Sequence, residues 1–221
     1  MTFSILARDP ETGAIGGAAA TGSLCVGGWV LRGHLSAGMS ASQGASPSTF
    51  WGEEVLEAMR GGAGADAAVR YVTGADAGKG YRQLAALDLN GATAAFTGDR
   101  NTPEMGSAAF DTGVVSGNML AGLDVLEGMV QAFEGATGGL DRRLLAALRA
   151  AEKAGGDSRG LLSAALLVLH PDHAPLTLRV DHHADDPIGA LADLHGRATS
   201  GEYAYWAQKV PVASDPERGL D

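Results

Sequence analysis

The hydrophobic and polar residues of the N-terminal part follow the short period of β-strands. Residues 2–8 mix β-forming side chains with partial alternation, and residues 9–13 combine Pro and Gly in a turn sequence. We therefore expect a β-hairpin whose return strand covers residues 14–21, where the small side chains suggest that another layer packs closely against the backbone. Two further short strands are expected over residues 24–31 and 35–43.

A helical period replaces this alternation in the next segment. Residues 46–59 begin with a Ser-Pro-Ser-Thr capping sequence and then repeat apolar side chains at helical spacing, and the pair Gly61 and Gly62 ends the pattern. A second helix is expected over residues 65–72. This part of the chain therefore supplies a pair of helices directly after the first strands.

A further hairpin and a second helix pair follow. The sequence Asn90-Gly91 is among the strongest short signals for a β-hairpin. The elements expected from here on are strands 82–88 and 93–97 around this turn, strand 112–116, helices 120–133 and 140–153, strands 163–169 and 177–180, and a short helix 186–191.

The order of these elements predicts the fold class. Strands, a helix pair, strands, a second helix pair, strands and a helix fit two sheets packed face to face with helices on their outer faces. We therefore expect an α+β fold, a four-layer αββα sandwich of two mainly antiparallel sheets. One domain is expected over residues 1–221, with residues 199–221 as a C-terminal arm.

Composition and charge exclude several classes of partner. Sixteen Lys and Arg against 26 Asp and Glu give a net charge of −10, which repels nucleic acid and anionic membrane surfaces. The single cysteine, Cys25, excludes an internal disulfide framework, and we expect it to be buried and inert in a cytoplasmic protein. Neither a secretory signal nor a membrane span is expected. A homodimer is the default expectation, because two-fold homomers are the commonest assemblies.

Common catalytic motifs are missing from the sequence. It has no phosphate-binding loop, no dinucleotide fingerprint and no S-x-x-K pair, and residues 38–42 lack the final glycine of a G-x-S-x-G elbow. His182 and His183 stand next to three aspartates, but adjacent strand residues point to opposite faces and would not converge on one ion. We therefore expect neither a metal site nor a cofactor.

Thr2 is the residue with the most informative position. Its small side chain permits removal of the initiator methionine, which would leave a free α-amine on a threonine. Such a residue carries a nucleophilic hydroxyl and its own base, since an α-amine with a pKa of about 7.7–8.0 is partly neutral near pH 7. Threonine after methionine is also common in proteins that lack this chemistry.

Three separated motifs carry a resemblance to a known family. The segments 2–13 (TFSILARDPETG), 116–122 (SGNMLAG) and 155–168 (GGDSRGLLSAALLV) together resemble the DUF1028 family of bacterial proteins. The resemblance extends from Thr2 to about Leu194. That family is grouped by fold with the N-terminal-nucleophile hydrolases, an αββα superfamily that includes proteasome subunits, amidases and acylases. The resemblance therefore implies that fold and a nucleophilic Thr2.

The resemblance also implies roles for further residues. Asn118 would donate its side-chain amide to an oxyanion, or else serves as a turn residue. Asp157, as a catalytic residue, and Arg159, as a substrate-binding residue, would form an ion pair that orients the amine or shapes their glycine-rich loop. Ser163 would hydrogen-bond the α-amine, or else caps the start of its strand.

Two more polar residues belong to the expected site. Gln43, at the end of a predicted strand, and Arg32 are candidates for substrate binding. Proteasome-type relatives place a lysine near the nucleophile, whereas Lys79, Lys153 and Lys209 all lie outside the first four predicted strands. Arg32 cannot replace that lysine as a proton shuttle, because a guanidinium does not lose its proton in proteins.

Two functions remain open at this point. The first is an amidohydrolase that cleaves a linear amide, a small acyl-amide or a peptide, through an acyl-enzyme on Thr2. The alternative is a binding or structural protein that has kept the fold and lost the chemistry. The first function requires polar side chains to converge on Thr2.

Overall fold

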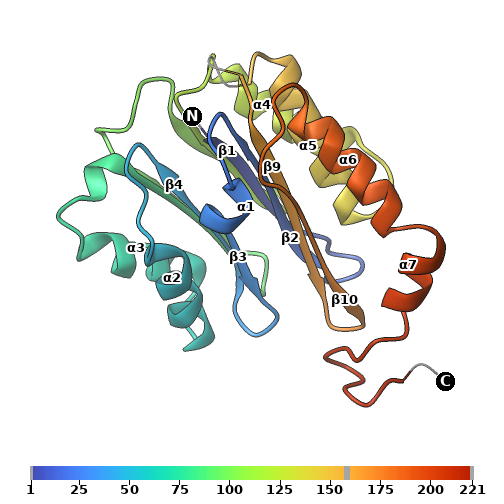
Figure 1. The fold of residues 1–221 in the computed structure, drawn as a ribbon. Helices are drawn as coiled ribbons and strands as arrows, with labels where there is room; N and C mark the ends of the chain where they lie inside the picture. The colour runs from blue at the N-terminus through green and yellow to red at the C-terminus, as the bar shows by residue number, and fades with distance from the viewer. Residues whose placement is uncertain (1, 157–159, 220–221) are drawn as a thin grey trace.

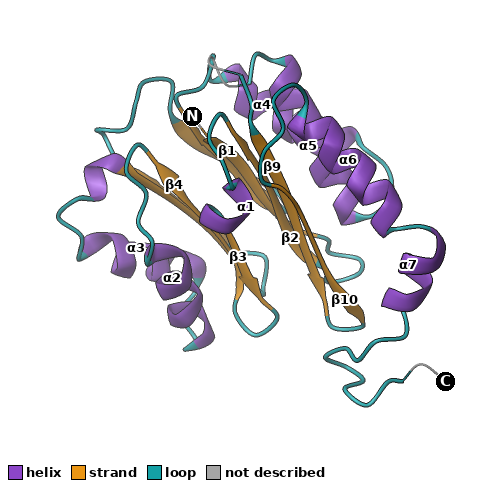
Figure 2. Ribbon diagram, in the orientation of Figure 1, coloured by secondary structure: helices purple, strands orange, loops and turns teal. Residues whose placement is uncertain are grey.

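Two antiparallel β-sheets pack face to face, and helices cover the outer face of each sheet (Figures 1 and 2). The computed structural model describes residues 2–156 and 160–219. The packing of two sheets between layers of helices confirms the expected α+β sandwich. In chain order the elements are β1 (Thr2–Arg8), β2 (Ile15–Thr21), α1 (Val26–Trp29), β3 (Leu31–His34), β4 (Gly38–Gly44), α2 (Trp51–Arg60), α3 (Ala65–Gly74), the 3₁₀ turn η1 (Lys79–Tyr81), β5 (Arg82–Asp88), β6 (Thr93–Thr97), β7 (Gly106–Phe110), β8 (Gly113–Asn118), α4 (Asp124–Gly135), α5 (Leu140–Lys153), β9 (Ser163–His170), β10 (His173–Val180), α6 (Pro187–Ala198) and α7 (Gly201–Ala207).

The N-terminal strand β1 lies inside the larger sheet. The strand order there is β10-β9-β2-β1-β8-β7, and the smaller sheet has the order β3-β4-β5-β6. The register places Thr2 opposite Thr21 on one side and opposite Asn118 on the other. The expected hairpins β1–β2 and β5–β6 are confirmed.

Three apolar layers hold the sandwich together. Alternation along β1 places Leu6 between the two sheets and Phe3 against α4 and α5 on the outer face. Leu6 packs with Met39 and Leu87 of the smaller sheet, and all three are fully buried. On the other side of the molecule, α2 and α3 cover the smaller sheet around Trp51. The central strands of each sheet are therefore buried on both faces.

Small side chains allow close packing at β2. All seven of its residues are buried, and Ile15 is the only one larger than threonine. A Cβ atom on Gly16 would lie 2.8 Å from the carbonyl oxygen of Leu167, and one on Gly17 would lie 2.7 Å from the side chain of Leu6. The predicted close packing against this strand is confirmed.

The strand expected over residues 24–31 is wrong. Cys25 has a φ of 61° in the left-handed region, which breaks the extended chain and leads into the single helical turn α1. The backbone N–H of Val26 donates to Ser163 Oγ at 3.1 Å, so a residue far along the chain holds this turn. A long-range contact of this kind leaves no signal in the local sequence.

Other elements differ in extent from the prediction. Strand β7 was not expected, because its Gly-Ser-Ala-Ala-Phe sequence is only partly buried at the sheet edge. Helix α6 continues to Ala198, and α7 lies in the segment expected to be an arm. None of the helices in the described part of the chain has the length and apolar character that a membrane span needs.

Side-chain caps start two of the helices. Ser48 Oγ accepts from the backbone N–H of Trp51 at 3.2 Å, which agrees with the capping sequence before α2. Asp186 accepts from the N–H of Gly189 at 2.6 Å at the start of α6 and pairs with Arg149 at 2.9 Å. The hydrogen bond from Gly189, followed by that from Arg149, lowers the pKa of Asp186 below its ordinary value.

Candidate functional site

Thr2 occupies the end of β1 between the two sheets. Because residues two apart share a face of a strand, Thr2 points to the same side as the inter-sheet residue Leu6. Its Oγ1 lies 3.1 Å from Oγ1 of Thr21 on β2. Two threonine hydroxyls therefore face each other where the sheets end.

A cavity of about 500 Å³ opens beside these hydroxyls. It is bounded by the ends of β1 and β2, the segment leading into α1, and the end of β4 with the residues that follow it. Helix α1 closes one side, where it contacts strands of both sheets. The described lining residues are Thr2, Thr21, Ser23, Leu24, Val26, Trp29, Val30, Ser42, Gln43, Gly44, Ala45, Ser46, Pro47 and Thr49.

Gln83 on β5 joins the two sheets next to this site. Its side chain is fully buried. Its Nε2 lies within hydrogen-bond distance of three acceptors, which share its two N–H groups: Thr97 Oγ1 at 2.8 Å and the carbonyl oxygens of Gly106 at 2.9 Å and Gly117 at 3.0 Å. Carbonyl oxygens can only accept, so these contacts fix which end of the amide carries the nitrogen.

The orientation of Gln83 fixes two neighbouring amides. Its Oε1 accepts from Nε2 of Gln43 at 2.7 Å and from Nδ2 of Asn118 at 3.3 Å. Nε2 of Gln43 also lies 3.5 Å from the carbonyl oxygen of Thr2. Asn118 uses one N–H toward Gln83 and retains a second. The structure thus brings together Thr2, Gln43 and Asn118 of the predicted site.

Buried polar atoms without a hydrogen-bond partner continue this group of side chains along β1, β4 and β8. Among the described residues, Oε1 of Gln43 and the hydroxyls of Ser4 and Ser116 are buried without a hydrogen-bond partner. Ser4 and Ser116 stand opposite each other in the β1–β8 ladder. We call Ser4, Gln43, Gln83, Ser116 and Asn118 the polar layer. Burying such groups costs stability, which is more typical of functional sites than of structural cores.

Ser163 lies close to this site, at the start of β9. It pairs with Thr21 in the β2–β9 ladder and is fully buried. Its hydroxyl donates to the carbonyl oxygen of Ser23 at 2.7 Å and accepts from the N–H of Val26. Ser163 therefore anchors the segment that borders the cavity.

The structure does not bring Arg32 to this site. Arg32 lies on the outer face of β3, where it pairs with Glu53 of α2 at 3.1 Å and donates to the Leu31 carbonyl oxygen. The strand expected over residues 24–31 gave no guide to this direction, because the chain turns through α1 first. Asp157 and Arg159 lie outside the described residues.

Several residues of the site were not expected from the sequence. Thr21 and Trp29 line the cavity, and Gln83 organises the polar layer. Gln83 carried a weak signal, since it is a polar residue at the start of the otherwise apolar run 84–87 in a predicted strand.

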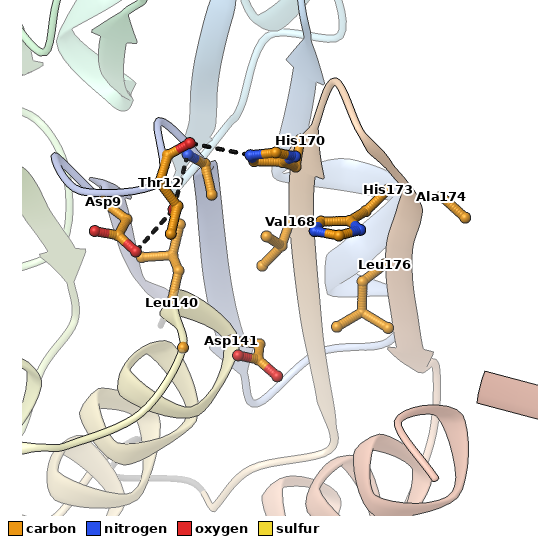
Figure 3. Close-up of a pocket in the computed structure, with 11 residues that line it drawn as sticks. Asp9, Thr12, Leu140, Asp141, Val168, His170, His173, Ala174 and Leu176 are labelled. Carbon is orange, nitrogen blue, oxygen red and sulfur yellow. Dashed lines mark hydrogen bonds between the residues drawn. The ribbon is translucent and has the colours of Figure 1, made fainter. Parts of the chain in front are cut away.

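A second cavity, of about 570 Å³, lies on the opposite face of the larger sheet (Figure 3). Nε2 of His170 lies 3.0 Å from the carbonyl oxygen of Thr12, and the ring of His170 stacks on that of His173 at 4.7 Å. Burial acts to raise the pKa of Asp9, but hydrogen bonds led by that from the Thr12 hydroxyl lower it. Among the described residues no group of three or more potential ligands is placed to bind a metal ion.

The fold and the site define an α+β sandwich in which an inner strand presents a threonine to a cavity between two sheets. Residues 2–191 match the model of a family of unknown function, DUF1028. The chain belongs to this family.

A crystal structure of a DUF1028 protein from Silicibacter pomeroyi is similar over the whole chain. The two sequences are 64% identical, the TM-score is 0.96, and the similarity covers 100% of this chain and 99% of the other. No curated protein matches the sequence significantly.

Proposed function

We propose that this protein is an N-terminal-nucleophile amidohydrolase that cleaves a linear amide through an acyl ester on Thr2. The observation that carries the proposal is the placement of Thr2, which begins β1 and borders the cavity of about 500 Å³. The layered sandwich of two antiparallel sheets is compatible with this superfamily.

The proposed reaction begins with loss of the initiator methionine, which exposes the α-amine of Thr2. Thr2 Oγ1 attacks the carbonyl carbon of the amide while the α-amine accepts the hydroxyl proton. The C–N bond breaks, the departing amine takes that proton, and an ester on Oγ1 remains. Water then attacks the ester, its proton passes through the α-amine to Oγ1, and the acid leaves.

Two neighbouring groups support this chemistry. The second N–H of Asn118, which lies opposite Thr2 in the ladder, is the candidate donor to the oxyanion. The segment that Ser163 anchors borders the same cavity and would position the substrate.

The proposal is tested with p-nitroanilides of acetic, butyric and benzoic acid, which release a coloured amine when the C–N bond breaks. Intact-mass spectrometry of untagged protein first establishes that the chain starts at Thr2. Thr2→Ala, which keeps the α-amine, should lower kcat by about a thousandfold or more, because the nucleophile is lost. Thr2→Ser should retain activity.

Thr21→Ala provides the matched control. It removes the other hydroxyl of the pair 3.1 Å away and should retain kcat within about tenfold. If Thr2→Ala stays as active as the wild type, Thr2 is not the nucleophile. If the chain keeps Met1 and hydrolyses none of the amides, the non-catalytic function is favoured.

A further inference from the structure

We infer that the cavity beside Thr2 binds an uncharged amide with an apolar, preferably aromatic, acyl group, and that Trp29 is the residue that selects for this group. The inference rests on the proposed function in placing the scissile amide at Thr2. It adds the substrate class.

The first observation is that the side chains of the described lining carry no charge. Its fourteen residues comprise hydroxyl-bearing, small and apolar side chains together with the amide of Gln43. Hydroxyls and amides donate and accept hydrogen bonds without charge, which matches the N–H and C=O of a neutral amide.

Charged side chains next to the lining are already paired. Arg179 packs against the glycines of α1 and makes three hydrogen bonds to the carboxylate of Asp181. Arg82 donates to the carbonyl oxygen of Ser46 and pairs with Asp76. Neither arginine is free to neutralise an anionic substrate.

The second observation is apolar surface at the border of the cavity. Leu24 is 55% exposed and Trp29 is 53% exposed, and both line the cavity. Exposed large apolar side chains cost free energy unless something covers them, and an aromatic acyl group placed on the Trp29 indole would remove both surfaces from water.

These observations disfavour both signs of charge once the α-amine at residue 2, with a pKa of about 7.7–8.0, is neutral. An ion that enters a cavity without an opposite charge loses its hydration and gains no partner, whereas a neutral amide replaces its water contacts with hydrogen bonds. We therefore expect the amide to bind about tenfold or more tightly than an ion of the same size.

The test uses Thr2→Ala protein, in which no turnover occurs, and three ligands of equal size: benzamide, benzoate and benzylammonium. Amide NMR titrations at constant ionic strength and at about pH 8.5, where the N-terminal α-amine is mostly neutral, give each Kd and the location of binding. Benzamide should shift signals of residues 22–30 and 43–49 and bind at least about tenfold more tightly than either ion.

Three further variants separate specificity from folding. Trp29→Ala should raise the Kd for benzamide by about fivefold or more. Trp206→Ala, which removes a 48% exposed tryptophan from α7, should leave this Kd unchanged. Thr49→Lys, which adds a cation to the lining, should lower the Kd for benzoate several-fold.

The inference is overturned if either ion binds as tightly as benzamide, if none of the three ligands binds at millimolar concentration, or if Trp29→Ala leaves the Kd unchanged. Its failure is distinguishable from that of the proposed function: selective benzamide binding by Thr2→Ala, with no amide hydrolysis by the wild type, would refute only the proposed function. Hydrolysis through Thr2 with a preference for charged acyl groups would refute only the inference.

Discussion

Replacing Gln83 with methionine should destabilise the protein strongly, because Gln83 connects the sheets through buried hydrogen bonds. Methionine has a similar length but neither donates to the carbonyls of Gly106 and Gly117 nor accepts from Gln43 and Asn118. A buried polar group left without a partner costs about 1–3 kcal/mol. If three partners remain unpaired at about 1–2 kcal/mol each, the free energy of unfolding falls by roughly 3–6 kcal/mol.

Urea denaturation followed by circular dichroism measures this loss, provided that the slope against denaturant is unchanged. Gln131→Met, at an exposed position of α4, is the matched control and should change stability by less than about 0.5 kcal/mol. A loss below about 1 kcal/mol for Gln83→Met would refute the reasoning, because it would mean that the polar layer contributes little to holding the sheets together.

Three further variants test other parts of the structure. Asp186→Ala should lower the free energy of unfolding by about 1 kcal/mol at pH 7, because it removes the cap of α6. Since hydrogen bonds lower the folded pKa of Asp186, the contribution of its charge is lost as the pH falls from about 4 through the folded pKa, and the difference in urea midpoint between the two proteins should shrink over this range. Gly38→Ala should cost at least about 2 kcal/mol more than Gly62→Ala in thermal unfolding, because both glycines have positive φ but only Gly38 is surrounded by backbone atoms; equal losses would contradict this. Ser163→Ala should accelerate hydrogen exchange at the Val26 amide, which loses its acceptor, and unchanged exchange would contradict the anchoring role.

Local patterns predicted the elements whose cause is local. The β5–β6 hairpin follows from Asn90-Gly91, and α5 begins and ends at the predicted residues because its apolar spacing is regular. Helix α1 could not be predicted in this way, since its start depends on Ser163, 137 positions away from Val26.

The site shows the same division. Thr2 was identified from its position in the sequence, and Asn118 and Gln43 were chosen from the resemblance and from a predicted strand end. That these residues meet depends on the register of β1 against β8 and on the stacking of the two sheets. Neither is encoded in any short segment. Gln83, which connects them, was therefore missed, and Arg32, expected to bind substrate, lies on the outer face of β3.

The small side chains of β2 affect how any survey of substitutions in this protein should be interpreted. Side chains larger than those present at Gly16 or Gly17 would collide with backbone or core atoms on both faces of the sheet. If Thr2 is the nucleophile that we propose, growth selections would mark these glycines as intolerant to change as strongly as Thr2, although the glycines act only through packing. Abundance measured alongside activity separates the two cases, because substitutions in β2 would lower both, whereas Thr2→Ala would lower activity alone.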